Sequence, residues 1–226
     1  SPASATPDRF LDRNGKLDPE RSQNGPWSAG IPGLPALLVH VAQKYGRLPL
    51  KQSLAPAIRI AREGFPVYAR MARGYQQKRA VMDRYPGTRA LFSPNGKPIA
   101  EGDLFRQPQL ASTLELLAEQ GFDGFYRGRV GRQLVAAVNA EGGQWTQAEL
   151  AGYSVKEREP IHFRYHDWNI VTAPPVSSGG IALAQMLQIL EPYDLKAMPE
   201  AQRVHLVVES MRRAYHDRTF YLGDPD

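Results

Sequence analysis

The chain has 226 residues, 42% of them hydrophobic and 23% charged, which is the composition of an ordinary globular protein. Such a composition argues against global disorder, a collagen helix and a coiled coil. The net charge is +5, but no run of five or more Lys or Arg occurs, so a solvated surface is favoured over a nucleic-acid site. Cysteine is absent, which excludes disulfides and thiol chemistry. No apolar stretch approaches the roughly 18 residues of a membrane span.

Both ends of the chain look cut. It begins at Ser1 instead of a methionine, and it stops at Asp226, soon after a long helical pattern. No composition shift divides the chain, so residues 1–226 are interpreted as a single partial domain. Residues 1–33 are rich in Pro, Gly, Ser, Asn and Asp, which predicts an irregular segment with a tight turn at residues 12–16.

Helical periodicity predicts most elements of the first two thirds of the chain. Apolar residues recur three and four positions apart, and prolines and glycines punctuate the repeats. Ser53 is the expected N-cap of the second helix, and Thr146 with Glu149 forms a capping box. Residues 88–106 are predicted to be a loop. The predicted helices cover residues 34–45, 53–63, 67–84, 109–120, 123–140 and a short segment from 147.

The pattern changes to a period of two after residue 160. Ile161, Phe163 and Tyr165 alternate with polar residues, which is typical of a half-buried strand. A second strand follows at residues 168–173 after a short turn. A β-hairpin over residues 161–173 is therefore the one sheet that the sequence predicts.

Two further helices are predicted, over residues 181–191 and 201–217, and a turn at residues 223–226 stops the last one. Arg212, Arg213, Asp217 and Arg218 mix charges of both signs at helical spacing, which is typical of a solvated, ion-paired helix end. The inward face of this helix is predicted to carry Val204, Val207, Val208, Met211 and Tyr215.

The sequence lacks the usual catalytic signatures. It contains no G-x-S-x-G elbow, no G-x-x-x-x-G-K-[ST] loop, no G-x-G-x-x-G and no H-E-x-x-H. No two histidines lie four residues apart on a predicted helix, and His162 and His166 fall on the hairpin. Surface or packing roles are therefore favoured over metal binding, which needs three or more convergent donors. The histidines are His40, His162, His166, His205 and His216.

One local segment asks for an explanation, because two serines and two glycines stand between a strand and a helix. The first N–H groups of that helix could receive an anionic group, and Gly179 and Gly180 would let a ligand or a backbone approach closely. Alternatively, Ser177 or Ser178 merely caps the helix and the glycines permit tight helix-on-sheet packing. A hydrolase that uses Ser178 as its nucleophile has no positional motif in its support.

Two segments together resemble motifs of the γ-glutamyltransferases. Residues 174–180 read P-P-V-S-S-G-G, close to that family's P-P-P-S-S-G-G, with Val176 in place of the third proline. Residues 214–226 contain A-Y-H-D-R and Y-L-G-D-P-D, close to A-Y-A-D-R and Y-L-G-D-P-D-F. Further similar motifs follow in the same order along the whole chain, at residues 30–33, 45–49, 56–65, 125–128 and 150–153.

This resemblance implies a fragment of an αββα N-terminal-nucleophile hydrolase sandwich, an α+β fold to which the chain supplies mostly outer helices and the hairpin. The complete protein would transfer or hydrolyse the γ-glutamyl group of glutathione-like donors through a threonyl acyl-enzyme, without metal or organic cofactor. Family precursors cut themselves, and the new N-terminal threonine of the small subunit is the nucleophile. That threonine would lie beyond Asp226, and the arginine that binds the substrate carboxylate would precede Ser1.

No catalytic residue is therefore expected in this chain, which alone is predicted to be inactive. The resemblance also implies that the small subunit of the same precursor is its partner and that the enzyme is periplasmic or secreted. Neither nucleic acid nor a membrane span is implied. A substrate-pocket role is predicted for Pro175, Ser177, Ser178, Gly179 and Gly180.

Two alternatives stay open. A sister acylase would act on cephalosporin side chains or on poly-γ-glutamate, and residues outside this chain would decide between them. A non-enzymatic helical interaction domain belongs to a different class, and a nucleic-acid binder ranks last. Without the other subunit, inward side chains such as Leu183, Met186 and Val207 are expected to be exposed and to promote association.

Overall fold

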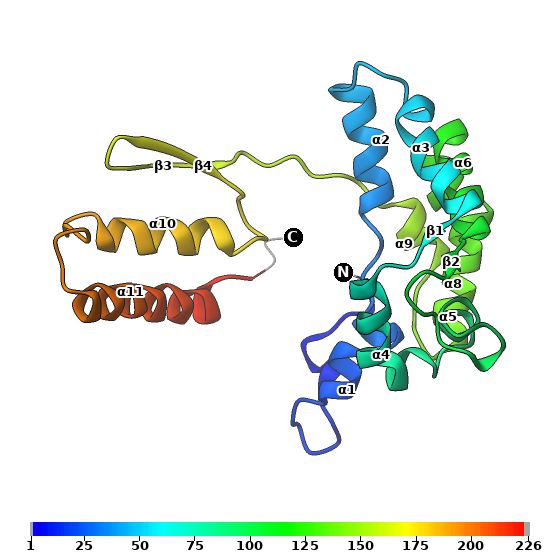
Figure 1. Ribbon diagram of the computed structural model, residues 1–226, viewed down its shortest axis with the longest axis horizontal. Helices are drawn as coiled ribbons and strands as arrows, with labels where there is room; N and C mark the ends of the chain where they lie inside the picture. Colours follow the sequence, from blue (N-terminus) through cyan, green and yellow to red (C-terminus); the bar gives the residue numbers. More distant parts are fainter. Residues whose placement is uncertain (1, 224–226) are drawn as a thin grey trace. The chain divides into compact units, whose positions relative to one another are not determined.

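The computed structural model describes residues 2–223, which fall into two compact units (Figure 1). The N-terminal unit comprises residues 1–155 and the C-terminal unit residues 156–226. The first residues of the C-terminal unit, 156–160, are exposed and lack regular structure. The composition of the chain contains no sign of this boundary. The predicted turn at residues 223–226 lies outside the described residues except for Gly223.

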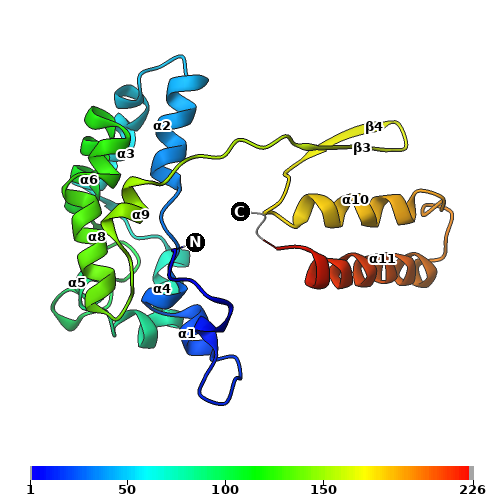
Figure 2. The same cartoon turned by 180° about the vertical axis from the view of Figure 1, so that it is seen from behind.

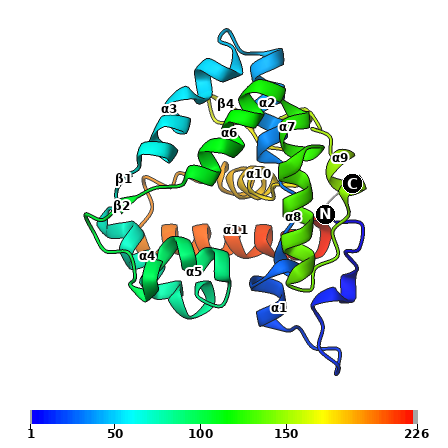
Figure 3. The ribbon, with the colours of Figure 1, turned by 90° about the vertical axis from the view of Figure 1, so that its right-hand side faces the viewer.

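The N-terminal unit is almost entirely helical, as the periodicity predicts. Helices α3 (Leu50–Glu63) and α6 (Pro108–Gln120) lie side by side (Figures 2 and 3). Two short strands, β1 (Phe65–Pro66) and β2 (Leu104–Phe105), form an antiparallel pair that the sequence did not reveal. The helices are α1 (Pro19–Gln23), α2 (Leu34–Lys44), α3 (Leu50–Glu63), α4 (Ala69–Met82), α5 (Pro86–Phe92), α6 (Pro108–Gln120), α7 (Phe122–Tyr126), α8 (Arg129–Ala140) and α9 (Gln147–Ala151).

Several helix boundaries differ from the prediction. Helix α3 begins at Leu50 after the N-cap Pro49, so Ser53 is not its cap. The predicted helix over residues 123–140 is interrupted, because Gly128 adopts an extended conformation between α7 and α8. Helix α5 occupies part of the predicted loop at residues 88–106. The capping box of Thr146 and Glu149 is confirmed, with both reciprocal hydrogen bonds present.

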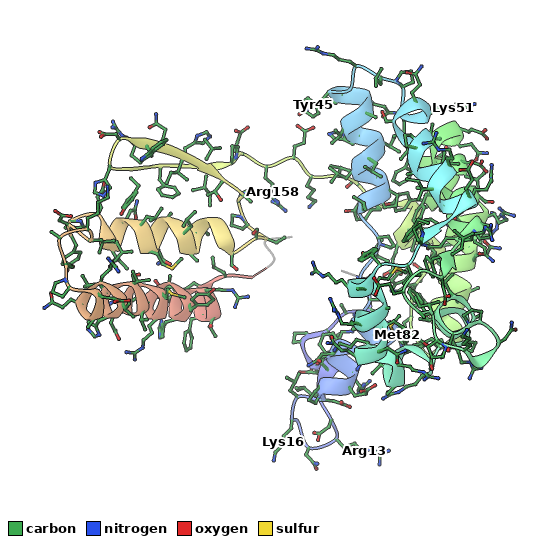
Figure 4. The ribbon with its side chains drawn as sticks, viewed as in Figure 1. Arg13, Lys16, Tyr45, Lys51, Met82 and Arg158 are labelled. Atoms are coloured by element: carbon green, nitrogen blue, oxygen red, sulfur yellow. The ribbon has the colours of Figure 1, made fainter. Side chains whose placement is uncertain are left out.

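The N-terminal segment has more structure than the prediction of an irregular segment over residues 1–33. Helix α1 begins after Asp18, whose side chain accepts hydrogen bonds from the first backbone N–H groups of the helix. The predicted tight turn is confirmed: Asp12 Oδ1 accepts from the backbone N–H groups of Asn14 and Lys16 at 2.8 and 2.9 Å. These bonds lower the pKa of Asp12. Arg13 and Lys16 extend from this turn (Figure 4).

The main core of the N-terminal unit forms around Tyr126, which is 0% exposed. Its hydroxyl accepts a hydrogen bond from Ala36 N at 3.1 Å and donates to the carbonyl oxygen of Pro32. Its ring stacks on Phe122 and Tyr153, with centroids 4.3 and 5.6 Å apart. The three motifs at residues 30–33, 125–128 and 150–153 therefore meet in one core. Their shared residue types are explained by packing around Tyr126.

A second, smaller core contains Tyr75, which is 3% exposed and stacks on Phe92 at 5.5 Å between ring centroids. The Tyr75 hydroxyl donates to Asp83 Oδ1 at 2.6 Å, and Arg79 Nε donates to Asp83 Oδ2 at 3.0 Å. The hydrogen bond from Tyr75, followed by that from Arg79, lowers the pKa of the Asp83 carboxyl. Asp83 thus joins the end of α4 to this core.

We expect the Asp83→Asn variant to be less stable than the wild type at neutral pH but equal to it in acid. Because the folded-state pKa of Asp83 lies below its unfolded value, the carboxylate stabilises the fold above pH about 4, and this contribution is lost as the pH falls through the folded-state pKa. Thermal unfolding of both proteins across that range measures the difference. Asp167→Asn, in the exposed turn of the hairpin, is the control. A pH-independent gap would contradict the expectation.

The C-terminal unit stacks a hairpin, α10 (Gly179–Leu190) and α11 (Glu200–Tyr221) in that order (Figures 1 and 2). The predicted hairpin is confirmed as β3 (Ile161–Tyr165) and β4 (Trp168–Thr172), with Phe163 opposite Ile170. Helix α10 begins two residues before the predicted start and ends one residue before the predicted end, and α11 extends one residue further at its start and four further at its end. Within residues 2–223, every helix is too short or too polar to cross a bilayer.

The face of α11 that contacts α10 differs from the predicted one. Ser210 and Ala214 are each 1% exposed, and their small side chains permit close approach of the two helices. Val207 is half-buried on the same stripe. The prediction of an inward face was wrong for four residues of the neighbouring stripe, which are between 40% and 52% exposed: Val204, Val208, Met211 and Tyr215.

Candidate functional site

The serine and glycine segment connects the end of β4 to the start of α10. A local turn is closed by a hydrogen bond from Ser177 N to the carbonyl oxygen of Pro174 at 3.2 Å. The peptide bond between Pro175 and Val176 is cis. Pro175 and Ser178 are half-buried, Ser177 and Gly179 are exposed, and Gly180 is buried. The five residues predicted to line a pocket therefore lie on the end of this connection and the first two positions of α10.

The two glycines of this segment have different roles. A Cβ on Gly180 would lie 2.2 Å from the carbonyl oxygen of Ala173 and 2.9 Å from Cγ2 of Thr172. Gly180 is thus required for the close packing of α10 on the end of β4. A Cβ on Gly179 would meet only Ser177 Oγ, at the ordinary contact distance of 3.6 Å. The predicted tight helix-on-sheet packing is therefore confirmed for Gly180 but not for Gly179.

Ser178 occupies the N-cap position of α10 but does not cap the helix. Its backbone is already helical, with φ −76° and ψ −14°, and its side chain makes no capping hydrogen bond. The hydroxyl instead accepts a hydrogen bond from Nε of Arg218 at 2.9 Å. The alternative interpretation of Ser178 as a simple helix cap is therefore wrong.

Arg218 belongs to the second motif of the sequence, and the structure brings the two motifs together. Ala214, Asp217 and Arg218 lie at positions i, i+3 and i+4 of α11, so they share one face of that helix. Asp217 Oδ2 accepts a hydrogen bond from Gln185 Nε2 of α10 at 2.6 Å. The motif thus joins α11 to α10 by one small buried residue and two polar contacts.

These contacts differ from the predicted solvated helix end. The prediction holds for Arg212, whose Nη1 pairs with Glu209 Oε1 at 2.6 Å and lowers the pKa of Glu209. It is incomplete for Asp217 and Arg218: Arg218 is exposed and Asp217 lies 3.3 Å from His216 Nδ1, but the two side chains also form hydrogen bonds with Gln185 of α10 and with Ser178. The helical spacing of Asp217 and Arg218 from Ala214 places the three residues on one face of the helix. Spacing alone does not show which element that face contacts.

A polar groove of about 710 Å³ runs along α10 and α11, next to the Asp217 contact. Its charges are mixed, since it contains two arginines together with Glu209 and Asp217. The residues that line it do not include the segment 174–180. The lining residues are Gln185, Ile189, Glu209, Arg212, Arg213, His216 and Asp217.

The histidines do not gather. His162 and His166 are exposed on the hairpin, and His216 Nδ1 lies 3.3 Å from Asp217 Oδ1. Among residues 2–223, no three side chains of His, Cys, Asp or Glu are placed to share a metal ion. The clearest convergence of polar side chains with a sequence motif is therefore that of Ser178 and Arg218.

The chain is similar to curated glutathione hydrolases and to solved structures of γ-glutamyltranspeptidases and a cephalosporin acylase. The glutathione hydrolase proenzyme of Escherichia coli (strain K12) is 37% identical over all of this chain, which spans 40% of that protein. The crystal structure of Helicobacter pylori γ-glutamyltranspeptidase matches 99% of this chain and 65% of its own, with a TM-score of 0.95 and 36% identity. The cephalosporin acylase from Bacillus halodurans matches 89% of this chain and 39% of its own, with a TM-score of 0.82 and 32% identity.

These structural matches confirm the predicted fold class, an α+β fragment of an N-terminal-nucleophile hydrolase. The chain spans about 40% of the curated glutathione hydrolase relatives that it matches. The family model described as Gamma-glutamyltranspeptidase matches residues 1–226, so both motifs and both compact units lie within the match. The chain belongs to the γ-glutamyltranspeptidase family.

Proposed function

We propose that the complete protein to which this chain belongs transfers or hydrolyses the γ-glutamyl group of glutathione-like donors. The observation that carries the proposal is the family match over the whole chain. The relatives named glutathione hydrolase proenzymes support the same donor class. The complete protein is proposed to be a precursor that cuts itself, and this chain to be part of the large subunit.

The reaction follows the logic of an N-terminal nucleophile. The threonine hydroxyl of the small subunit attacks the γ-carbonyl carbon, while its own amine accepts the hydroxyl proton. The bond to the donor nitrogen breaks, the amine product leaves with a proton, and a γ-glutamyl-threonine ester remains. Water or an acceptor amine then attacks the ester and restores the threonine. Backbone N–H groups stabilise the oxyanion of each tetrahedral intermediate.

Within this scheme the segment from Pro175 to Gly180 forms the floor of the substrate pocket on the large-subunit side. Its position is supported by the close packing of Gly180 on β4 and by the hydrogen bond from Arg218 to Ser178. The small subunit covers this floor and supplies the nucleophile. The mature enzyme resides in the periplasm or is secreted.

An intact-mass spectrum of the complete gene product under denaturing conditions tests the proposal. We expect two chains, the smaller one beginning with threonine, because self-cleavage must free the threonine amine. Replacing that threonine by alanine is expected to leave one uncut chain. A single uncut chain from the wild-type gene would contradict the proposal and favour a non-enzymatic interaction domain.

Residues 1–226 on their own are expected to show no saturable hydrolysis of a γ-glutamyl anilide. The threonine nucleophile of the proposed mechanism is not among these residues, and neither is the carboxylate-binding arginine. The matched measurement uses the complete protein at equal concentration. Activity of the isolated chain that Ser178→Ala abolishes would instead favour a serine hydrolase and overturn this part of the proposal.

The second candidate is an acylase that acts on cephalosporin side chains, and the structural match to a cephalosporin acylase favours it over other classes. Comparison of kcat/KM for a γ-glutamyl anilide and for a cephalosporin that carries a dicarboxylic acyl side chain separates the two. We expect the γ-glutamyl donor to be preferred. Preference for the cephalosporin would replace the proposed substrate but keep the acyl-threonine chemistry.

A further inference from the structure

We infer that Arg218 is a positioning residue for the pocket floor, and that it acts through the hydroxyl of Ser178. The inference rests on the proposed function, because it assigns the segment from Pro175 to Gly180 to the substrate site. It adds a role for the A-Y-H-D-R motif, which otherwise contributes only to the packing of α11.

The first observation is that the Ser178 side chain does not make the hydrogen bond that is usual for a serine at a helix N-cap. A serine at an N-cap normally accepts a hydrogen bond from a backbone N–H of the first helical turn. Here the hydroxyl makes no such bond and accepts from Arg218 Nε at 2.9 Å. The side chain thus contacts Arg218 of α11, which lies 40 residues further along the chain.

The second observation concerns how the segment is held. The turn from Ser177 to Pro174 is local, and Gly180 fixes only the start of α10 against β4. Within the described part of the chain, the bond from Arg218 is the only side-chain hydrogen bond to residues 174–180. Arg218 therefore supplies the long-range constraint on the serine itself.

The third observation is that the part of α11 that carries Arg218 is held against α10 by its neighbours. Its neighbour Asp217 is bound by Gln185 at 2.6 Å, and Ala214, one turn before, is 1% exposed against α10. Arginine is always charged, and its planar guanidinium donates in fixed directions. Since the Ser178 oxygen accepts from Nε, its own proton points away from Arg218. The hydroxyl proton is therefore free to be donated to a group in the proposed pocket.

The test uses the complete, self-processed enzyme and four variants: Arg218→Met, Ser178→Ala, the double variant, and Arg203→Met. Arg203 is an exposed arginine on the same helix and serves as the control. Arg218→Met removes the donor but keeps a long side chain for packing. We expect kcat per cleaved molecule to fall about tenfold to hundredfold, because a small misplacement of a positioned group costs that much. KM is expected to stay within about threefold, since ground-state binding uses other contacts.

Two further readouts separate positioning from a merely structural role. The double variant is expected to be no slower than the slower single variant, because both remove the same contact. The thermal unfolding midpoint is expected to match that of Arg203→Met. Should Arg218→Met fold poorly, Arg218→Lys replaces it: lysine keeps the charge but lacks the fixed Nε–H, so the same loss of kcat with normal stability is expected.

The outcomes are distinct. Wild-type protein without self-cleavage or γ-glutamyl transfer would defeat the proposed function. An active wild type together with Arg218 variants that keep kcat within about twofold would overturn the inference alone. Multiplicative losses in the double variant, or a kcat that falls only in parallel with the unfolding midpoint for both Arg218 variants, would also overturn it.

Discussion

Replacing Gly180 by alanine is expected to destabilise the start of α10 more than any other single-methyl change at the candidate site. The added Cβ would lie 2.2 Å from the carbonyl oxygen of Ala173, a backbone atom that cannot rotate away. The helix must therefore move off the end of β4. Overpacking of this kind costs about 1–3 kcal/mol of unfolding free energy. Hydrogen exchange of the backbone amides in α10, measured on the complete protein, localises the effect.

Gly179→Ala is the matched control, because it adds the same methyl group one residue earlier in the same helix. Its Cβ would meet only Ser177 Oγ at 3.6 Å, and alanine suits a helix better than glycine by about 0.5–1 kcal/mol. We therefore expect the backbone amides of α10 to exchange as slowly as in the wild type, or slightly more slowly. Equal effects of the two substitutions on exchange would show that the contact with Ala173 does not limit the position of α10.

The second large effect is expected at Tyr126, the centre of the main core. Tyr126→Ala removes a ring that stacks on two neighbours and leaves a cavity, which costs about 3–5 kcal/mol. Tyr126→Phe keeps the ring but leaves Ala36 N and the carbonyl oxygen of Pro32 without their partner, at a cost of about 1–3 kcal/mol. Denaturant or thermal unfolding of the variants measures both values. Tyr68→Phe, at a position that is 58% exposed, is the control.

The pH dependence of the same variants gives an independent check. Burial raises the pKa of Tyr126, partly offset by the hydrogen bond from Ala36. Because the folded-state pKa lies above the unfolded value of about 10, stability is retained below that pH and is lost as the pH rises through the folded-state pKa. Tyr126→Phe should lose less stability than the wild type across this range. Identical losses in both proteins would assign the alkaline effect to other groups.

The helices and the hairpin were predictable because their signals are local. The period of two in β3 and β4, the capping box before α9 and the repeats of α2 and α6 each lie within a few residues of sequence. Errors arose where two local signals competed. A serine cap was expected at Ser53, but Pro49 starts α3 and the helix continues through Pro56. The break at Gly128 was hidden by apolar residues at helical spacing on both sides.

The segment from Pro175 to Gly180 was singled out from its residues, but the contacts of its members could not be predicted. Sequence rules treat Ser178 as a cap and the two glycines as equivalent. In the structure the two glycines differ because only Gly180 packs against a backbone oxygen, that of Ala173, and Ser178 pairs with Arg218. Arg218 itself had been interpreted as part of a solvated helix end, because its spacing could not show what faces it.

Sequence motifs alone were sufficient to indicate the family and most of the elements, since both depend on residue types and short spacings. The contacts that explain those motifs required the folded chain. Tyr126 meets Ala36 across 90 residues, and Arg218 meets Ser178 across 40. Such pairs are selected by the packing of whole helices, which depends on shape and burial over the entire unit. No local pattern in the sequence encodes that selection, so only the tertiary structure could show which polar groups find one another.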